Sequence, residues 1–189
     1  NIETPKVHDI EVSYFDMDYV SGQNFEEFFS IASVNDVEFV VSTLFDYFDT
    51  LISTARNVDA SNKILKKIAI LKEKTSYPKY IEFLRKYVED KRMIVPHTFC
   101  HGDLTFANII FHQNRLFFID FLDCYVDTFL SDLVKLKQDL YHLWAVHNQD
   151  VYTVRIHQIY EYIWDKLEIR YADYLTESFH ILDVINALR

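Results

Sequence analysis

Two short apolar runs separated by a polar loop place the strongest constraint on how this chain can fold. Residues 108–111 read Asn-Ile-Ile-Phe, and residues 116–119 read Leu-Phe-Phe-Ile. Short runs rich in β-branched and aromatic residues are typical of buried strands rather than of helices. The loop between them, residues 112–115, contains Asn114, which adopts a left-handed backbone conformation at low cost. We therefore expect a two-stranded β-hairpin in the middle of the chain.

Polar side chains gather at the open end of this expected hairpin. Asn108 begins the first strand, Asp120 follows the second, and Asp103 lies in the loop that enters the first strand. The far ends of two hairpin strands lie side by side, so these side chains should come close together. Carboxylate and amide oxygens suit Mg²⁺, which takes one or two protein carboxylates and binds nucleotide phosphates as well. A further carboxylate that accepts a proton from an attacking hydroxyl would complete a site for phosphoryl transfer.

The central stretch also contains a recognisable motif. It begins with His101-Gly102-Asp103-Leu104 and continues with Asn108 and then Asp120. This pattern resembles the catalytic core of aminoglycoside phosphotransferases, choline kinases and related small-molecule kinases, which are relatives of the protein kinases. Protein kinases carry His-Arg-Asp and Asp-Phe-Gly at these places. Here a glycine replaces the arginine, and a leucine replaces the final glycine; both departures are usual among the small-molecule kinases.

The resemblance implies a role for each residue of the motif. Asp103 would be the catalytic base, and Asn108 and Asp120 would hold Mg²⁺ at the phosphates of ATP or another nucleoside triphosphate. His101 would be a structural residue of the catalytic loop. Asp132 would brace that loop from the start of a helix, a position where an acidic residue is also favoured by the helix dipole.

Other polar residues near the motif have competing interpretations. Asp123 is a candidate substrate contact, with a solvated loop as the alternative, and Asp127 is assigned to the loop. A zinc site is disfavoured, because the spacing of the candidate ligands matches no standard zinc pattern and a second ligand pair is missing. Those candidate ligands are His97, Cys100, His101 and His112.

A strand is expected near the N-terminus. Residues 11–20 combine β-forming residues with partial alternation, and Ser21-Gly22 supplies a turn signal after them. Under the resemblance, the end of this strand would be the hinge whose backbone binds adenine, and an ordinary edge strand is the alternative. The residues assigned to the hinge are Met17, Asp18, Tyr19 and Val20. Such a strand, without its sheet partners, would be able to pair with a second copy and give a homodimer.

Glycine is scarce, and this limits the nucleotide-binding machinery. The chain contains Gly22 and Gly102, which lie far apart, so it can form neither a G-x-G-x-x-G loop nor a Walker loop. We therefore expect residues 1–22 to be the end of an N-terminal lobe and its hinge, with the nucleotide-covering part upstream. Residues 23–189 would be a helical C-terminal catalytic lobe. The expected class is α+β and mostly helical: the C-terminal lobe of a protein-kinase-like fold with a small catalytic β-hairpin.

Helical spacing dominates the rest of the chain. Asn35 and Glu38 resemble a capping box, and the apolar pattern after them predicts a helix to about Asn57. Ser61 is expected to cap the next helix, and Pro78 to lie in the first turn of a third. Further helices are expected over residues 129–146, 151–169 and 172–188.

Composition narrows the range of partners and the location. The formal net charge of −10 argues against nucleic acid, whose phosphates are bound by an excess of Lys and Arg. No apolar stretch has the length of a membrane span, and no signal pattern opens the chain. Cys100 and Cys124 cannot build a disulfide framework, which favours a reducing compartment. We expect a cytoplasmic protein that binds neither nucleic acid nor membrane.

Together these features predict an ATP- and Mg²⁺-dependent phosphotransferase that acts on a hydroxyl of a small molecule, such as an aminoglycoside, a choline-like alcohol or a sugar. The chain would be a fragment that lacks the Gly-rich loop. One alternative is a catalytically incompetent kinase-like module for binding or scaffolding, which the missing loop supports. A metal-dependent hydrolase is a weaker alternative, because the chain offers none of the extra ligands that such a site uses.

Overall fold

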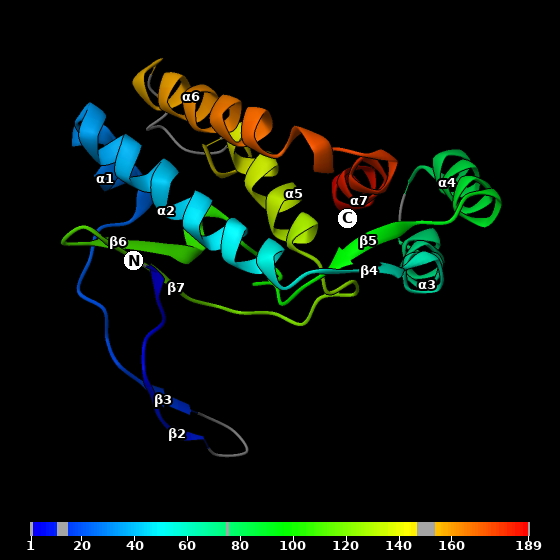
Figure 1. Ribbon diagram of the computed structural model, residues 1–189, viewed down its shortest axis with the longest axis horizontal. Coiled ribbons are helices and arrows are strands. Elements are labelled where there is room, and N and C mark those ends of the chain that lie inside the picture. The colour runs from blue at the N-terminus through cyan, green and yellow to red at the C-terminus, as the bar shows by residue number, and fades with distance from the viewer. Residues whose placement is uncertain (1, 11–14, 75, 147–153, 189) are drawn as a thin grey trace.

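The computed structural model describes residues 2–10, 15–74, 76–146 and 154–188. This part of the chain is α+β and mostly helical, as predicted, with small sheets beside a group of helices (Figure 1). The helices are α1 (Phe25–Ile31), α2 (Val34–Ser53), α3 (Ser61–Lys72), α4 (Pro78–Asp90), α5 (Phe129–Leu140), α6 (Val154–Arg170) and α7 (Glu177–Ala187). The strands are β1 (Ile2–Glu3), β2 (Val7–Ile10), β3 (Phe15–Met17), β4 (Arg56–Asp59), β5 (Ile94–His97), β6 (Ile109–His112) and β7 (Arg115–Phe118).

The predicted central hairpin is confirmed, but its loop is shorter than the predicted residues 112–115, because His112 and Arg115 pair with each other as strand residues. β6 and β7 pair antiparallel, with Ile109 opposite Phe118 at the open end. Gln113 and Asn114 form the turn with φ of 44° and 58°, so both residues are left-handed, as a tight turn between twisted strands requires. β1 adds to β7 in parallel and completes a three-stranded sheet of order β1-β7-β6.

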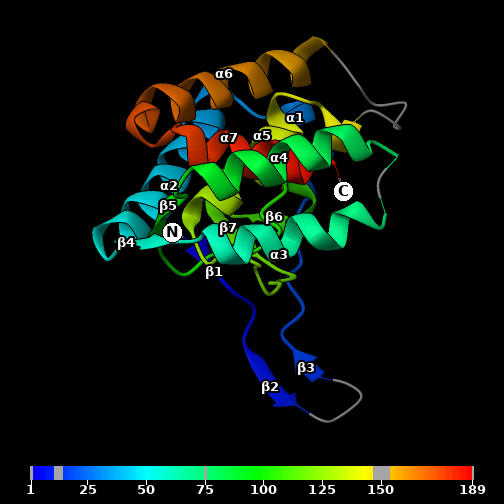
Figure 2. The ribbon, with the colours of Figure 1, turned by 90° about the vertical axis from the view of Figure 1, so that its right-hand side faces the viewer.

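β2 and β3 form a second hairpin, which extends away from the helices in both views (Figures 1 and 2). The strand predicted over residues 11–20 appears at Phe15–Met17, whereas residues 18–20 have no regular structure and residues 11–14 lie outside the described residues. The chain returns to the body at Gln23. Its N–H donates to Phe111 O at 2.8 Å, and its carbonyl accepts from Phe111 N–H at 2.9 Å.

The predicted boundaries of α2 were wrong at both ends. The N-cap is Ser33, whose hydroxyl accepts from Asp36 N–H at 3.3 Å, and the Asp36 carboxylate accepts from Ser33 N–H at 2.6 Å. A capping residue needs an extended backbone, and Asn35 is already helical, so it cannot cap. The helix ends at Ser53 because the following residues form β4, which pairs antiparallel with β5.

The later helices agree with the predictions apart from their ends. Ser61 is the first residue of α3 rather than its cap, and its hydroxyl accepts from Met93 N–H at 2.9 Å, next to β5. Pro78 lies in the first turn of α4, as expected. α5 stops at Leu140, and within the rest of the predicted range a 3₁₀ turn forms at Trp144–Val146. Another 3₁₀ turn, Ala172–Tyr174, precedes α7, while residues 151–153 of the helix predicted over residues 151–169 lie outside the described residues.

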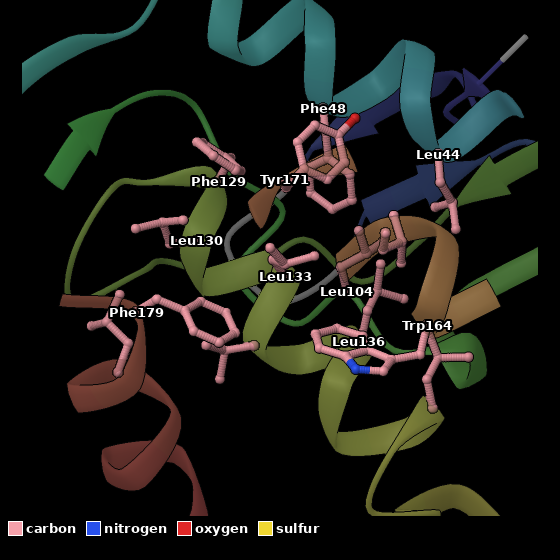
Figure 3. Close-up of a cluster of buried hydrophobic side chains, with 14 of the residues drawn as sticks. Leu44, Phe48, Leu104, Phe129, Leu130, Leu133, Leu136, Trp164, Tyr171 and Phe179 are labelled. Carbon is pink, nitrogen blue, oxygen red and sulfur yellow. The ribbon is translucent and has the colours of Figure 1, made fainter. Parts of the chain in front are cut away.

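The hydrophobic core surrounds α5, which contacts α2, α6 and α7 (Figure 3). The buried side chains labelled there come from these helices, from the residue that follows α6 and from the loop before β6: Leu44, Phe48, Leu104, Phe129, Leu130, Leu133, Leu136, Trp164, Tyr171 and Phe179. Through this packing α5 becomes the fixed support for the loop that carries the motif. No helix in the described ranges combines the length and the apolar character needed to cross a membrane.

Candidate active site

The loop between β5 and β6 carries the motif, and the carboxylate of Asp132 holds its first half. Asp132 Oδ2 accepts from His101 N–H at 2.8 Å, and Oδ1 accepts from Gly102 N–H at 2.9 Å. The hydroxyl of Tyr47, on α2, donates to Oδ2 at 2.8 Å. Asp132 is fully buried, and burial raises the pKa of its carboxyl to about 6, although these three hydrogen bonds act to lower it. The contacts are those that a loop-bracing residue requires.

Gly102 allows the loop to approach the segment that follows β7. Its φ is +89°, and a Cβ at this position would lie 2.1 Å from Leu122 O. Only glycine fits so close an approach with this backbone conformation. A backbone hydrogen bond also joins the loop to this segment, since Leu122 N–H donates to His101 O at 2.9 Å. The two halves of the motif are therefore joined through their backbones.

His101 connects the same two segments through its ring. Its Nε2 lies 2.8 Å from Ile119 O, and its Nδ1 lies 3.3 Å from Asp103 N. The backbone groups fix the tautomer: Nε2–H donates to the carbonyl, and Nδ1 accepts from the Asp103 N–H. Burial lowers the pKa of the ring, against the opposing effect of the Asp103 and Asp120 carboxylates. The lowered pKa favours the neutral ring, and its two contacts link His101 to both segments.

Asp103 holds its carboxylate between two donors. Lys135 Nζ, from α5, lies 2.9 Å from Asp103 Oδ1. Asn108 Nδ2 donates to Asp103 O at 2.8 Å and lies 3.4 Å from Oδ2. The side chain of Asp103 is 28% exposed, so it remains accessible to a small molecule. This arrangement orients the carboxylate without burying it.

A second acidic residue of α5, Asp139, holds the other half of the loop. Its Oδ2 accepts from Phe106 N–H at 2.8 Å, at the 3₁₀ turn Phe106–Asn108. Burial raises the pKa of this carboxyl to about 6, while the Phe106 hydrogen bond and the charge of Lys135 act to lower it. Its Oδ1 is buried and has no hydrogen-bond partner within the described ranges.

Sequence reasoning missed Lys135 and Asp139. Both stand at helical spacing from Asp132, three and seven residues later, and so lie on the same side of α5. Polar residues that recur at this spacing on an otherwise apolar helix face were the available signal.

A cavity of about 790 Å³ opens beside Asp103. Its wall combines the motif residues with side chains from α5, α7 and the 3₁₀ turn after α5. Beyond Asp103, Asn108, Lys135 and Asp139, its polar or aromatic lining residues are Phe25, Thr105, Gln138, His142, Trp144, Asp183 and Asn186.

Asp120 lies at the open end of the β6–β7 hairpin. Ile119 N–H donates to Asn108 O at 3.1 Å, which brings Asp120 next to Asn108 across the hairpin. Asp120 is exposed with φ of 61°, and its carboxylate makes no hydrogen bond or ion pair with any described residue. Asp123 is exposed and lines two smaller neighbouring cavities rather than the one at Asp103.

The residues assigned to the hinge do not line the cavity at Asp103. Met17 ends β3, and Asp18 contacts His8 of the β2–β3 hairpin at 2.5 Å. Tyr19 is 91% exposed, and Val20 is partly buried. The structure therefore brings together Asp103, Asn108, Asp120, His101 and Asp132, whereas the hinge residues lie apart from them.

Comparison with known proteins gives one result. The sequence model of the phosphotransferase enzyme family matches residues 43–169, more than half of the chain and all of the loop between β5 and β6. No curated protein and no solved structure matches the chain. The matched range contains Asp103, Asn108, Asp120 and Asp132, while the hinge residues precede it. The chain belongs to the phosphotransferase enzyme family, which confirms the resemblance to the aminoglycoside phosphotransferases and choline kinases.

Proposed function

We propose that this protein transfers the terminal phosphoryl group of ATP, or of another nucleoside triphosphate, to a hydroxyl of a small molecule. One observation carries the proposal: the Asp103 carboxylate faces a ligand-sized cavity and is oriented by Lys135 and Asn108. A carboxylate held in this way can accept the proton of an acceptor hydroxyl as that oxygen attacks. Membership in the family supports the same reaction class.

Asn108 and Asp120 are the residues that would hold Mg²⁺. Asn108 uses its Nδ2 on Asp103, which leaves the amide oxygen available, and the Asp120 carboxylate is uncommitted among the described residues. Within those residues no group of three or more His, Cys, Asp or Glu side chains converges on a point that could hold a metal ion. The donor set fits an ion that takes few protein ligands and is completed by phosphates and water. When bound, Mg²⁺ would neutralise charge on the phosphates.

We propose that the acceptor binds in the cavity beside Asp103. Its volume of about 790 Å³ lies in the range of ordinary ligand pockets. Gln138 and Asn186 form a hydrogen-bonded pair of 2.7 Å on its wall, and Trp144 presents an exposed ring. Asp183 on the same wall is paired with Lys137 at 2.5 Å. A polar, hydroxyl-bearing molecule the size of a sugar or an amino alcohol fits these groups.

The test is phosphorylation of a panel of hydroxyl compounds by the protein that contains this chain, with Mg·ATP as donor. Asp103→Asn should lower kcat by roughly 10²–10⁴-fold, the usual contribution of a general base. Asp46→Asn, which alters an exposed aspartate on α2, is the matched control and should leave kcat unchanged. Undiminished turnover in Asp103→Asn would show that Asp103 is not the general base. If the protein binds Mg·ATP but phosphorylates none of the hydroxyl compounds, that result would count against the proposed reaction.

A further inference from the structure

We propose that Lys135 is a catalytic residue that binds the phosphoryl group during its transfer. This inference rests on the proposed function, because it assigns a residue to the same reaction. The motif and its family resemblance assign no role to Lys135. The argument comes from its position between the carboxylate of Asp103 and the cavity.

Lys135 is the single Lys or Arg among the described residues that line the cavity at Asp103. Its side chain is 13% exposed, and its Nζ lies 2.9 Å from Asp103 Oδ1. A lysine covered to this extent has few alternative positions for its charge, unlike a surface lysine with a mobile stem. The cation is therefore fixed at the place where the proposed base acts.

The neighbouring contacts of α5 fix that position further. Asp132 holds His101 and Gly102, and Asp139 holds Phe106. Lys135 lies between these two acids on the helix, and it contacts the loop between the two anchored points. Rotation or sliding of α5 would break the hydrogen bonds of both Asp132 and Asp139. The fold therefore fixes the position of Lys135 along the helix axis relative to Asp103.

The Lys135 ammonium group has three N–H donors, and the described ion pair, with Asp103 Oδ1, needs only one of them. The remaining donors are available to negative charge that develops in the reaction. Phosphoryl transfer spreads such charge over the oxygens of the moving group, and cationic side chains stabilise it there.

The distances allow Lys135 to meet that charge. An acceptor hydroxyl that gives its proton to Asp103 must lie about 2.6–3.2 Å from a carboxylate oxygen. Lys135 Nζ is already one hydrogen bond from the same carboxylate. The acceptor oxygen forms the new bond to phosphorus as its proton passes to Asp103, and the bond to the departing nucleoside diphosphate breaks. Lys135 keeps its proton throughout and donates to a phosphoryl oxygen.

A purely structural brace is the competing explanation, and a transition-state mimic separates the two. Calorimetry would measure the affinity of the protein that contains this chain for Mg·ADP, first alone and then with aluminium fluoride, which imitates a phosphoryl group in transit. The variants are Lys135→Met, Lys135→Arg, and Lys86→Met as control. Lys86 is an exposed lysine on α4, away from the cavity lining.

Wild-type protein should bind the aluminium fluoride complex at least about 10²-fold more tightly than ADP alone, as transition-state analogues do. Lys135→Met should lose roughly 10²-fold or more of that affinity, as when one donor to a transition-state charge is removed. Its affinity for Mg·ADP should not change. Lys135→Arg should recover part of the loss, and Lys86→Met should match the wild type. If Lys135→Met does not fold, Lys135→Gln, which keeps a donor to Asp103, takes its place.

The two failures are distinguishable. If the variant loses thermal stability but keeps the wild-type ratio of the two affinities, Lys135 is only a brace and the inference is overturned. If wild-type protein gains nothing from aluminium fluoride, the proposed function fails, and the role of Lys135 falls with it.

Discussion

Tyr47→Phe offers a direct test of how the loop between β5 and β6 is held. The substitution removes one hydroxyl, which donates to Asp132 Oδ2 at 2.8 Å, and it leaves the aromatic ring in place. Within the described ranges, Asp132 then keeps two backbone donors, His101 and Gly102. The change isolates a single hydrogen bond to the carboxylate that anchors the loop.

The size of the effect depends on pH, because Asp132 changes charge with a pKa of about 6, raised by burial from the usual 3.8. The ionised carboxylate therefore costs the folded state about 3 kcal/mol at pH 7.5, a cost that disappears as the pH falls below about 4. Loss of the Tyr47 donor raises this pKa further, so the variant suffers more as the pH rises. We expect Tyr47→Phe to cost about 1.5–3 kcal/mol at pH 7.5, and about 0.5–1.5 kcal/mol at pH 5, where the carboxyl is protonated.

The assay is urea denaturation of both proteins at pH 5 and at pH 7.5, followed by circular dichroism. Tyr160→Phe is the matched control, because Tyr160 is also buried but its hydroxyl has no hydrogen-bond partner in the described part of the chain. That variant should be as stable as the wild type or slightly more stable. A Tyr47→Phe cost that is equal at both pH values would refute the assignment of this hydrogen bond to an ionising Asp132.

Two further predictions concern local structure. Gly102→Ala places a Cβ 2.1 Å from Leu122 O at a φ of +89°, and it should cost at least about 2 kcal/mol in a denaturation experiment; a neutral result would mean that the two halves of the motif are not in contact. Ser33→Ala should cost about 1 kcal/mol through loss of the α2 cap, whereas Asn35→Ala should be neutral or slightly stabilising, as measured by thermal unfolding; the reverse order would restore the cap predicted at Asn35.

The parts of the fold that depend on local chemistry were predictable from the sequence. The β6–β7 hairpin is an example, because β-forming residues flank a turn that contains Asn114, and neither feature needs information from elsewhere. The order and spacing of Asp103, Asn108 and Asp120 also indicated that they lie together at its open end. In both cases the signal is contained within the central stretch of the chain.

The pairing of β4 with β5 was not predictable in this way. β4 reads Arg-Asn-Val-Asp, and all four residues are exposed, so the strand has no apolar alternation to reveal it. It forms because β5 offers backbone partners, with Val58 opposite Val95.

The prediction of the α2 cap at Asn35 was wrong for a different reason. Ser33–Asp36 and Asn35–Glu38 have the same spacing, and the backbone conformation, which the sequence does not display, decides between them.

The polar residues of α5 show how the missing information could be recovered from physical reasoning. Asp132 and Asp139 are buried on a helix whose other buried residues are apolar. A buried carboxylate is tolerated only with hydrogen-bond donors, and the backbone N–H groups of the interior of α5 are used within the helix. The donors must therefore come from neighbouring segments: Tyr47 on α2 supplies one to Asp132, and the loop that carries the motif supplies the others.

Two buried acids, two turns apart on one helix, thus specify where the loop between β5 and β6 lies and which of its N–H groups face the helix. Asp132 has three donors, whereas Asp139 has one and keeps an oxygen without a partner in the described residues. The loop is consequently held more firmly at its His101–Gly102 end than at Phe106. Lys135 stands between the two anchors and meets Asp103. The polar residues of α5 are therefore better understood as the groups that position the loop between β5 and β6 than as exceptions within an apolar face.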